Sequence, residues 1–191
     1  MTKTDIFNRA LALIGHDRMI PEGNTTMTEY VRCNSEWDGA RRAVLTAQDW
    51  NWLVEETALI DGAETPDENS ERLEYMYDRP DDCIRLVAML DWNHRRVDHR
   101  QAGGYIYSEV DSAKFRYLPD AEDPDDWPSC IVDAVVYELA ARISLAMTAS
   151  GKVVQAMKQL AMSYLADARR IDASEDRRGG TEGDKYALSR R

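Results

Sequence analysis

The most informative segment of the chain is Ile131–Met147, which reads IVDAVVYELAARISLAM. Apolar residues recur along it at the spacing of an α-helix, and they cover most of its circumference rather than one stripe. A helix that is apolar on most sides must be buried on several of them. We therefore expect a helix that is either central in its domain or part of an interface between subunits. The residues that we expect at such a subunit interface are Ile131, Val135, Leu139 and Ile143.

The segments on either side of this helix also carry helix signals. Asp123–Pro128 places acidic residues and a proline where a helix begins. Ser150 and Gly151 allow a tight turn into a second apolar-periodic segment, which ends near Ser174. Because the connection is so short, the two helices should pack as antiparallel neighbours.

The N-terminal part of the chain carries two more helical patterns. Residues Ile6–Ile14 place their apolar side chains on one face. A longer helix should begin near Thr26–Glu29, whose residue types fit a capping box, and should end near Ala47. We therefore predict a mainly α fold, with a four-helix bundle core made of residues 1–49 and 121–174.

Residues 50–120 lose the helical period. Aromatic residues and short apolar runs between turn signals, such as Cys83–Leu90 and Gly104–Tyr107, predict strands. Thr57–Ile60 also has the composition of a strand. We expect a small antiparallel β region inserted into the bundle.

Residues 175–191 contain three glycines and few apolar side chains, so we expect a flexible, extended C-terminal tail. A disordered end without a role is one interpretation of this composition. The other is that the last six residues dock on a partner protein. The residues that would make this contact are Tyr186, Leu188, Arg190 and Arg191.

The charge of the chain argues against tight DNA binding. The sequence has 24 basic and 35 acidic side chains and a formal net charge of −11, and nearly all of the excess lies in residues 61–126. A nucleic-acid-binding protein should show a concentrated basic face, and a helical transcription factor would need a basic recognition helix. No apolar run approaches the roughly 18 residues of a membrane span.

The sequence has no recognisable catalytic or cofactor motif. Cys33, Cys83 and Cys130 are far apart, with no Cys-x-x-Cys pair, so we expect three buried free thiols in a reducing compartment. His94 and His99 lie close to acidic residues, but their spacing fits an exposed polar loop better than a metal site. We therefore expect no metal, no cofactor and no enzymatic activity.

Carboxylates distant in the sequence could nevertheless meet in space, which leaves a hydrolase open. The neighbouring pairs Glu55/Glu56 and Asp81/Asp82 cannot flank one bond by themselves, because adjacent residues of an extended chain point to opposite faces.

The chain carries a series of short motifs in a fixed order. They are Ala10–Gly15, Cys33, Trp37, Arg41–Leu45, Asp49–Trp52, Thr57–Leu59, Arg79–Arg85, Tyr105–Tyr107, Trp127–Pro128, Glu138–Ile143 and Ala166–Arg170. Together these motifs resemble the tail tubular protein A family, the head-to-tail adaptors of short-tailed bacteriophages. The resemblance covers the chain from its first helix to about residue 175.

The resemblance implies a structural protein of the virion neck, made in the host cytoplasm, with no cofactor and no membrane contact. Members of the family form a dodecameric ring between the portal protein and a tail nozzle protein similar to tail tubular protein B. DNA passes through the ring without specific binding, and an acidic lumen would keep it from adhering. The C-terminal segments reach along the portal, which makes the portal the implied partner of the C-terminal residues named above. The alternatives are another neck or tail-completion protein and a tail-associated peptidoglycan hydrolase.

Overall fold

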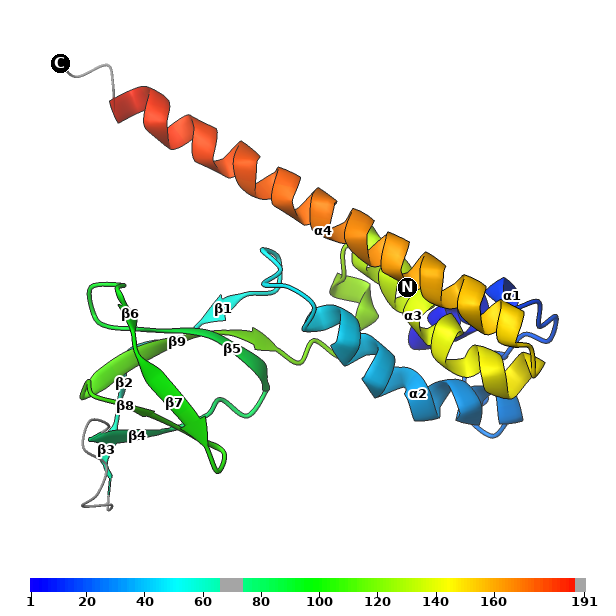
Figure 1. Cartoon of the computed structure of the whole chain (residues 1–191), viewed down its shortest axis with the longest axis horizontal. Helices are drawn as coiled ribbons and strands as arrows, with labels where there is room; N and C mark the ends of the chain where they lie inside the picture. The colour runs from blue at the N-terminus through cyan, green and yellow to red at the C-terminus, as the bar shows by residue number, and fades with distance from the viewer. Residues whose placement is uncertain (66–73, 188–191) are drawn as a thin grey trace. The chain divides into compact units, whose positions relative to one another are not determined.

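The computed structural model describes residues 1–65 and 74–187, with side chains described as far as residue 175 (Figure 1). The chain divides into two compact units. One, the helical unit, comprises Met1–Asn51 and Ala121–Arg191, and the other, the β unit, comprises Trp52–Asp120. The described residues form four α-helices, all in the helical unit, and nine strands, all in the β unit.

The prediction of a mainly α protein with a four-helix bundle core was wrong. Besides the four helices, the described residues form nine strands in two antiparallel sheets, one of them curled into half a barrel. The β region is therefore a unit with its own core rather than a small addition to a bundle. Fewer strands were expected than the described residues form, because most of these strands have only two to four residues, too few to show a period of their own.

The four helices begin close to the predicted positions, and the first three also end close to them. They are α1 (Lys3–Leu13), α2 (Thr28–Leu45), α3 (Ser129–Thr148) and α4 (Gly151–Ala187). Thr2 caps α1 through a capping box with Asp5. The capping box expected at Thr26–Glu29 is absent, because α2 starts after Met27 without a side-chain cap and Glu29 points to the preceding loop instead.

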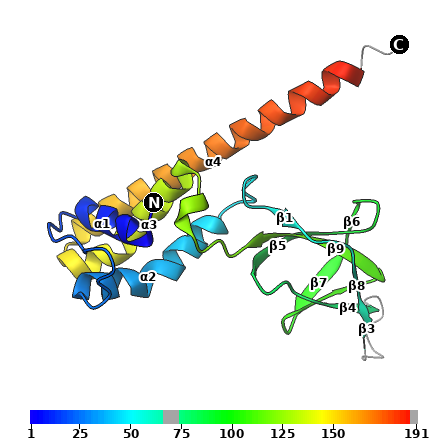
Figure 2. The same ribbon diagram turned by 180° about the vertical axis from the view of Figure 1, so that it is seen from behind.

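Helix α3 lies at the centre of the helical unit and packs against α1, α2 and α4 (Figures 1 and 2). Aromatic side chains fill the space beside it. Trp37 of α2 stacks on Trp127 with a centroid distance of 5.9 Å, and Phe7 of α1 meets the Trp37 ring edge-on at 5.6 Å. The guanidinium of Arg41 is buried under this cluster and donates a hydrogen bond to the carbonyl of Ala121 at 3.0 Å.

The prediction of an extended tail at residues 175–191 was also wrong as far as residue 187. Helix α4 continues without a break to Ala187. Once a helix has formed, each added residue gains a backbone hydrogen bond without a new nucleation cost. Glutamate and arginine, which occur at Glu175, Arg177 and Arg178, also favour the helical conformation. The glycines that suggested a tail are therefore accommodated in the helix.

The β unit consists of two antiparallel sheets. The first has the strand order β1-β9-β5-β6, with β2 also paired to β9, and the second has the order β3-β4-β8-β7. The strands are β1 (Glu55–Glu56), β2 (Ile60–Asp61), β3 (Ala63–Glu64), β4 (Tyr75–Asp78), β5 (Cys83–Leu90), β6 (Arg96–Val97), β7 (His99–Ala102), β8 (Tyr105–Ser108) and β9 (Ser112–Pro119). Of the strand predicted at Thr57–Ile60, only Ile60 lies in a strand, β2, while residues 57–59 connect β1 to β2. The strands β1 and β2 pair with different parts of β9.

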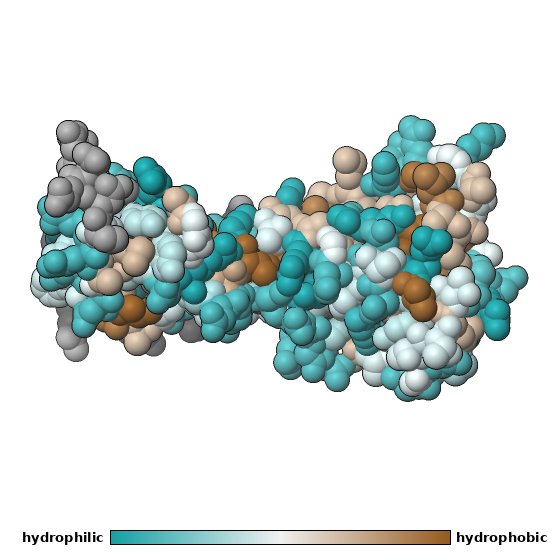
Figure 3. All heavy atoms as spheres, turned by 90° about the horizontal axis from the view of Figure 1, so that it is seen from below, coloured by the Kyte–Doolittle hydropathy of each residue, from teal (hydrophilic) through white to brown (hydrophobic). Residues whose placement is uncertain are grey.

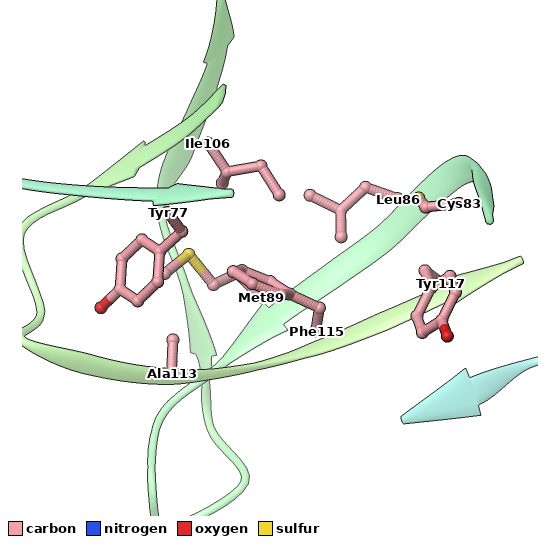
Figure 4. Packing of buried hydrophobic residues seen from close by; sticks show 8 residues of the cluster. All are labelled: Tyr77, Cys83, Leu86, Met89, Ile106, Ala113, Phe115 and Tyr117. Atoms are coloured by element: carbon pink, nitrogen blue, oxygen red, sulfur yellow. The ribbon is translucent and has the colours of Figure 1, made fainter. Parts of the chain in front are cut away.

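The core of the β unit lies between its sheets. Tyr77 and Phe115 meet edge-to-face with a centroid distance of 5.5 Å, and Met89 is buried in the same cluster (Figure 4). The Tyr77 hydroxyl donates a hydrogen bond to the carbonyl of Val110, which fixes the ring. Burial raises the pKa of Tyr77 to about 12, so this hydroxyl remains a donor over the physiological pH range.

Replacing Gly62 with alanine should destabilise the β unit by about 2 kcal/mol. A Cβ atom at this position would lie 2.7 Å from Cζ of Tyr77 and 2.9 Å from Cβ of Tyr75, and neither side chain can move freely. Urea denaturation followed by circular dichroism measures the loss. Gly151→Ala is the control, since a Cβ there meets nothing within 4 Å and should not destabilise the protein. Equal stability of the two variants would contradict the close packing at Gly62.

Candidate partner-binding surfaces

The residues expected at a subunit interface lie inside the subunit. Ile131, Val135, Leu139 and Ile143 all have 0% of their surface exposed, because α3 is surrounded by the three other helices. They fill the core of their own chain and offer no surface to a neighbouring copy, which corrects the expectation. The apolar circumference of α3 is instead explained by its central position in the helical unit, the other possibility that the sequence left open.

The residues expected to bind a partner lie at the end of α4 and beyond it. Tyr186 belongs to the last turn of the helix, while Leu188, Arg190 and Arg191 lie outside the described residues. Their role stays a prediction. The structure adds that the segment leading to them, as far as Ala187, is helical.

Only the first part of α4 is packed within the helical unit. Met157, Ala161, Ala168 and Asp172 are buried, whereas Ala173, Ser174 and Glu175 are exposed. The helix then continues for fifteen residues after Asp172, as far as Ala187, which corresponds to about 22 Å. This part of α4, which we call the α4 extension (residues 173–187), projects past the other three helices (Figures 1 and 2).

A cluster of hydrogen bonds fixes α4 at the base of this extension. The Asp172 carboxylate, only 5% exposed, accepts hydrogen bonds from Gln48 Nε2 at 2.6 Å and from the backbone N–H of Asn51 at 3.0 Å. The Asn51 side chain donates to both the backbone and the carboxylate of Asp172. One turn earlier, Arg169 donates to the carbonyl of Ala47 at 2.8 Å. The segment after α2 is therefore tied to the last buried turn of α4.

A second buried carboxylate lies at the start of α2. Glu29 Oε1 is 3.4 Å from His16 Nε2 and 3.5 Å from Arg18 Nη1, both in the loop after α1. The pKa of Glu29 is lowered, first by a hydrogen bond from its own backbone N–H and then by His16 and Arg18, while burial acts in the opposite direction. The carboxylate is thus held ionised, and it fastens the connection between α1 and α2.

The histidines considered as metal ligands have other partners in the β unit. His94 Nδ1 is 3.3 Å from Glu56 Oε1, and His94 Nε2 is 3.3 Å from the ammonium group of Lys114. Asp91 accepts hydrogen bonds from the backbone of Asn93 and Arg95 and so shapes the turn that carries His94. Within residues 1–65 and 74–187, no group of three or more His, Cys, Asp or Glu side chains is arranged to hold a metal ion.

Two carboxylates from distant parts of the sequence meet at Tyr117. The hydroxyl of Tyr117 lies 3.3 Å from Glu55 Oε2, and it also hydrogen-bonds the side chain of Asp82. Burial, followed by the charges of Asp82 and Glu55, raises the pKa of Tyr117 to about 12. The protonated hydroxyl therefore serves as a donor between two acceptors, an arrangement that stabilises the contact between β1, β9 and the start of β5.

The three cysteines are free thiols, and they differ in exposure. Cys33 and Cys83 are buried, but Cys130 is only half-buried, so the expectation that all three are buried was wrong for Cys130. Burial raises the pKa of the Cys33 thiol to about 12, which keeps it protonated and unreactive. Cys130 is the second residue of α3, and its partial burial raises the pKa of its thiol.

Comparison with known proteins did not identify a family for the chain. A scan against models of protein families found no match, and a search of curated proteins found no similar sequence. Among the helices that the structure describes, none combines the length and the apolar character needed to cross a membrane.

Proposed function

We propose that the protein is a head-to-tail adaptor of a short-tailed bacteriophage, which forms a ring between the portal protein and the tail nozzle. The observation that carries the proposal is the α4 extension, fifteen residues of helix beyond the last turn that α4 buries in its own unit. A helix gains most of its stability by packing an apolar face against other groups. A long helix that projects past the other helices of its unit is therefore suited to a partner that supplies further contacts.

The sequence motifs that resemble the adaptor family supply the identity of that partner. In this proposal the α4 extension and the residues after it contact the portal protein through Tyr186, Leu188, Arg190 and Arg191. The two arginines would pair with carboxylates of the portal, and Tyr186 and Leu188 would supply apolar contact area. The last buried turn of α4, held by Asp172, would give the extension a defined direction.

The charge of the β unit fits a DNA channel better than a DNA-binding site. Residues 52–120 carry 16 acidic and 8 basic side chains, a net charge of −8. Such a surface repels phosphate groups, so DNA could pass it during ejection without adhering. The protein would then act by assembly alone, as a ring of identical subunits in the virion, a dodecamer as in the family that the motifs resemble.

Electron microscopy of the portal complex tests this proposal. The purified full-length chain is mixed with the portal protein from the same genome, and the mixture is imaged in negative stain. We expect a collar of added density on one end of the portal. We also expect a chain that ends at Ser174, and so lacks the extension and the last residues, to lose the collar because the portal contacts are removed.

A second variant separates the contribution of the proposed contact residues from that of the length of the helix. The combined substitutions Tyr186→Ala, Arg190→Ala and Arg191→Ala keep the length of α4 but remove three of the proposed contacts. The portal concentration needed to form the collar should then rise at least tenfold. A collar that survives both changes would refute the role of the C-terminal residues. A bare portal with the full-length chain would refute the adaptor function.

A further inference from the structure

A groove runs along the seam between α3 and α4 in the helical unit. It consists of two adjoining hollows of about 350 Å³ and about 460 Å³, and both are lined by Lys158 and Met162 of α4. Ala141 and Leu145 of α3 contribute to one side, and Val154 and Leu165 of α4 contribute to the other. The groove lies on the packed part of α4 and is thus distinct from the α4 extension.

The groove exposes apolar side chains that nothing in the helical unit covers. Met162 is 73% exposed and Leu145 is 62% exposed. They stand near each other because both line the same hollow, which joins the end of α3 to the first turns of α4. On the face drawn in Figure 3, by comparison, apolar residues form small patches within a largely hydrophilic surface. Two large apolar side chains beside one groove are typical of a site that binds another protein.

The charge of the groove defines the partner further. Lys158 lines both hollows and forms no ion pair with any residue that the structure describes. The other cation, Arg142, is held by Glu138 at 2.8 Å and by Glu36 at 3.9 Å. The charged residues that line the groove are Glu138, Arg142 and Lys158, so the lining has a net charge of +1 and a carboxylate is its natural complement.

We propose that this groove binds an acidic amphipathic helix of a partner protein. The lining residues of α4 run from Gly151 to Leu165, which corresponds to about 21 Å, the length of about four turns of an incoming helix. Apolar residues of that helix at positions i, i+4 and i+7 would cover Leu145 and Met162. A glutamate or aspartate of the same helix would pair with Lys158. The inference does not depend on the adaptor function.

Peptide binding to the full chain tests the proposal. The probe is a fluorescein-labelled 18-residue helical peptide with leucine at the i, i+4 and i+7 positions and glutamate beside them, and its matched control carries lysine in place of every glutamate. Fluorescence anisotropy should show the acidic peptide binding at least tenfold more tightly than the basic one. Lys158→Glu should reverse this preference, and Met162→Ser with Leu145→Ser should weaken both peptides at least tenfold.

Leu160→Ser is the control variant, since Leu160 is a partly exposed residue of α4 that does not line the groove, and it should leave the binding of the acidic peptide unchanged. Circular dichroism establishes that each variant is folded. Equal affinities for the two peptides, or no binding of either, would overturn the proposal. A chain that self-associates until Met162 is replaced, and that the acidic peptide cannot dissociate, would overturn it in favour of a second copy in the groove.

Discussion

Replacing Trp50 with alanine should lower the free energy of unfolding of the helical unit by about 4 kcal/mol. The indole of Trp50 is fully buried, and its Nε1 donates a hydrogen bond to the carbonyl of Val44 at 3.0 Å. The substitution therefore leaves a large cavity behind the end of α2, and the carbonyl of Val44 loses this donor but keeps its hydrogen bond from the backbone N–H of Ala47. Urea denaturation followed by circular dichroism at 222 nm measures the loss.

Two variants separate the causes of this effect. Trp50→Phe keeps most of the apolar volume but removes the hydrogen-bond donor, and it should cost about 2 kcal/mol. Trp92→Ala removes the same type of side chain from a turn where it is 72% exposed, and it should cost less than about 0.5 kcal/mol. If Trp50→Ala and Trp92→Ala had similar stabilities, the buried position of Trp50 would be wrong.

Replacing Asp172 with alanine should destabilise the helical unit by about 3 kcal/mol. The change removes the charged acceptor of Gln48 Nε2 and of the Asn51 backbone N–H. Gln48 is half-buried and Asn51 is exposed, so the loss comes from the hydrogen bonds to the buried carboxylate itself. It should also loosen α4 where the extension begins. Hydrogen exchange of the Asn51 amide should therefore become faster in the variant, in addition to the loss measured by urea denaturation.

Asp167→Ala is the matched control for this substitution. Asp167 lies on the same helix, but its carboxylate is exposed and, among the described residues, pairs only with Arg170. A surface ion pair of this kind contributes less than about 1 kcal/mol. Similar losses for the two variants would show that the hydrogen bonds of Asp172 do not stabilise the protein.

The sequence predicted the elements whose signal is local. The apolar segment Ile131–Met147 lies within α3, and the pattern at Cys83–Leu90 coincides with β5. A helix or strand of that length repeats its period several times, so burial of one face leaves a clear pattern. The tight turn after Ser150 was equally visible, because glycine and serine interrupt the helical period there.

The candidate sites could not be predicted in the same way. Asp172 receives hydrogen bonds from Gln48 and Asn51, more than 120 residues earlier in the chain, and no local pattern connects them. The exposure of Leu145 and Met162 was equally hidden, since both fit an apolar helix pattern as well as their buried neighbours do. The sequence signal that could have indicated the groove is that α3 and α4 carry apolar residues on more than one face, more than their packing against each other covers.

The sequence alone therefore determined where helices form, which residues are apolar enough to be buried, and how the charge is distributed along the chain. The tertiary structure alone decided that α3 is the centre of one chain, that β1 and β2 pair with β9, and that α4 continues to Ala187. The physical reason is that periodicity records only whether a residue faces an apolar environment. Which segment supplies that environment depends on contacts between residues far apart in the sequence, which form only when the whole chain folds.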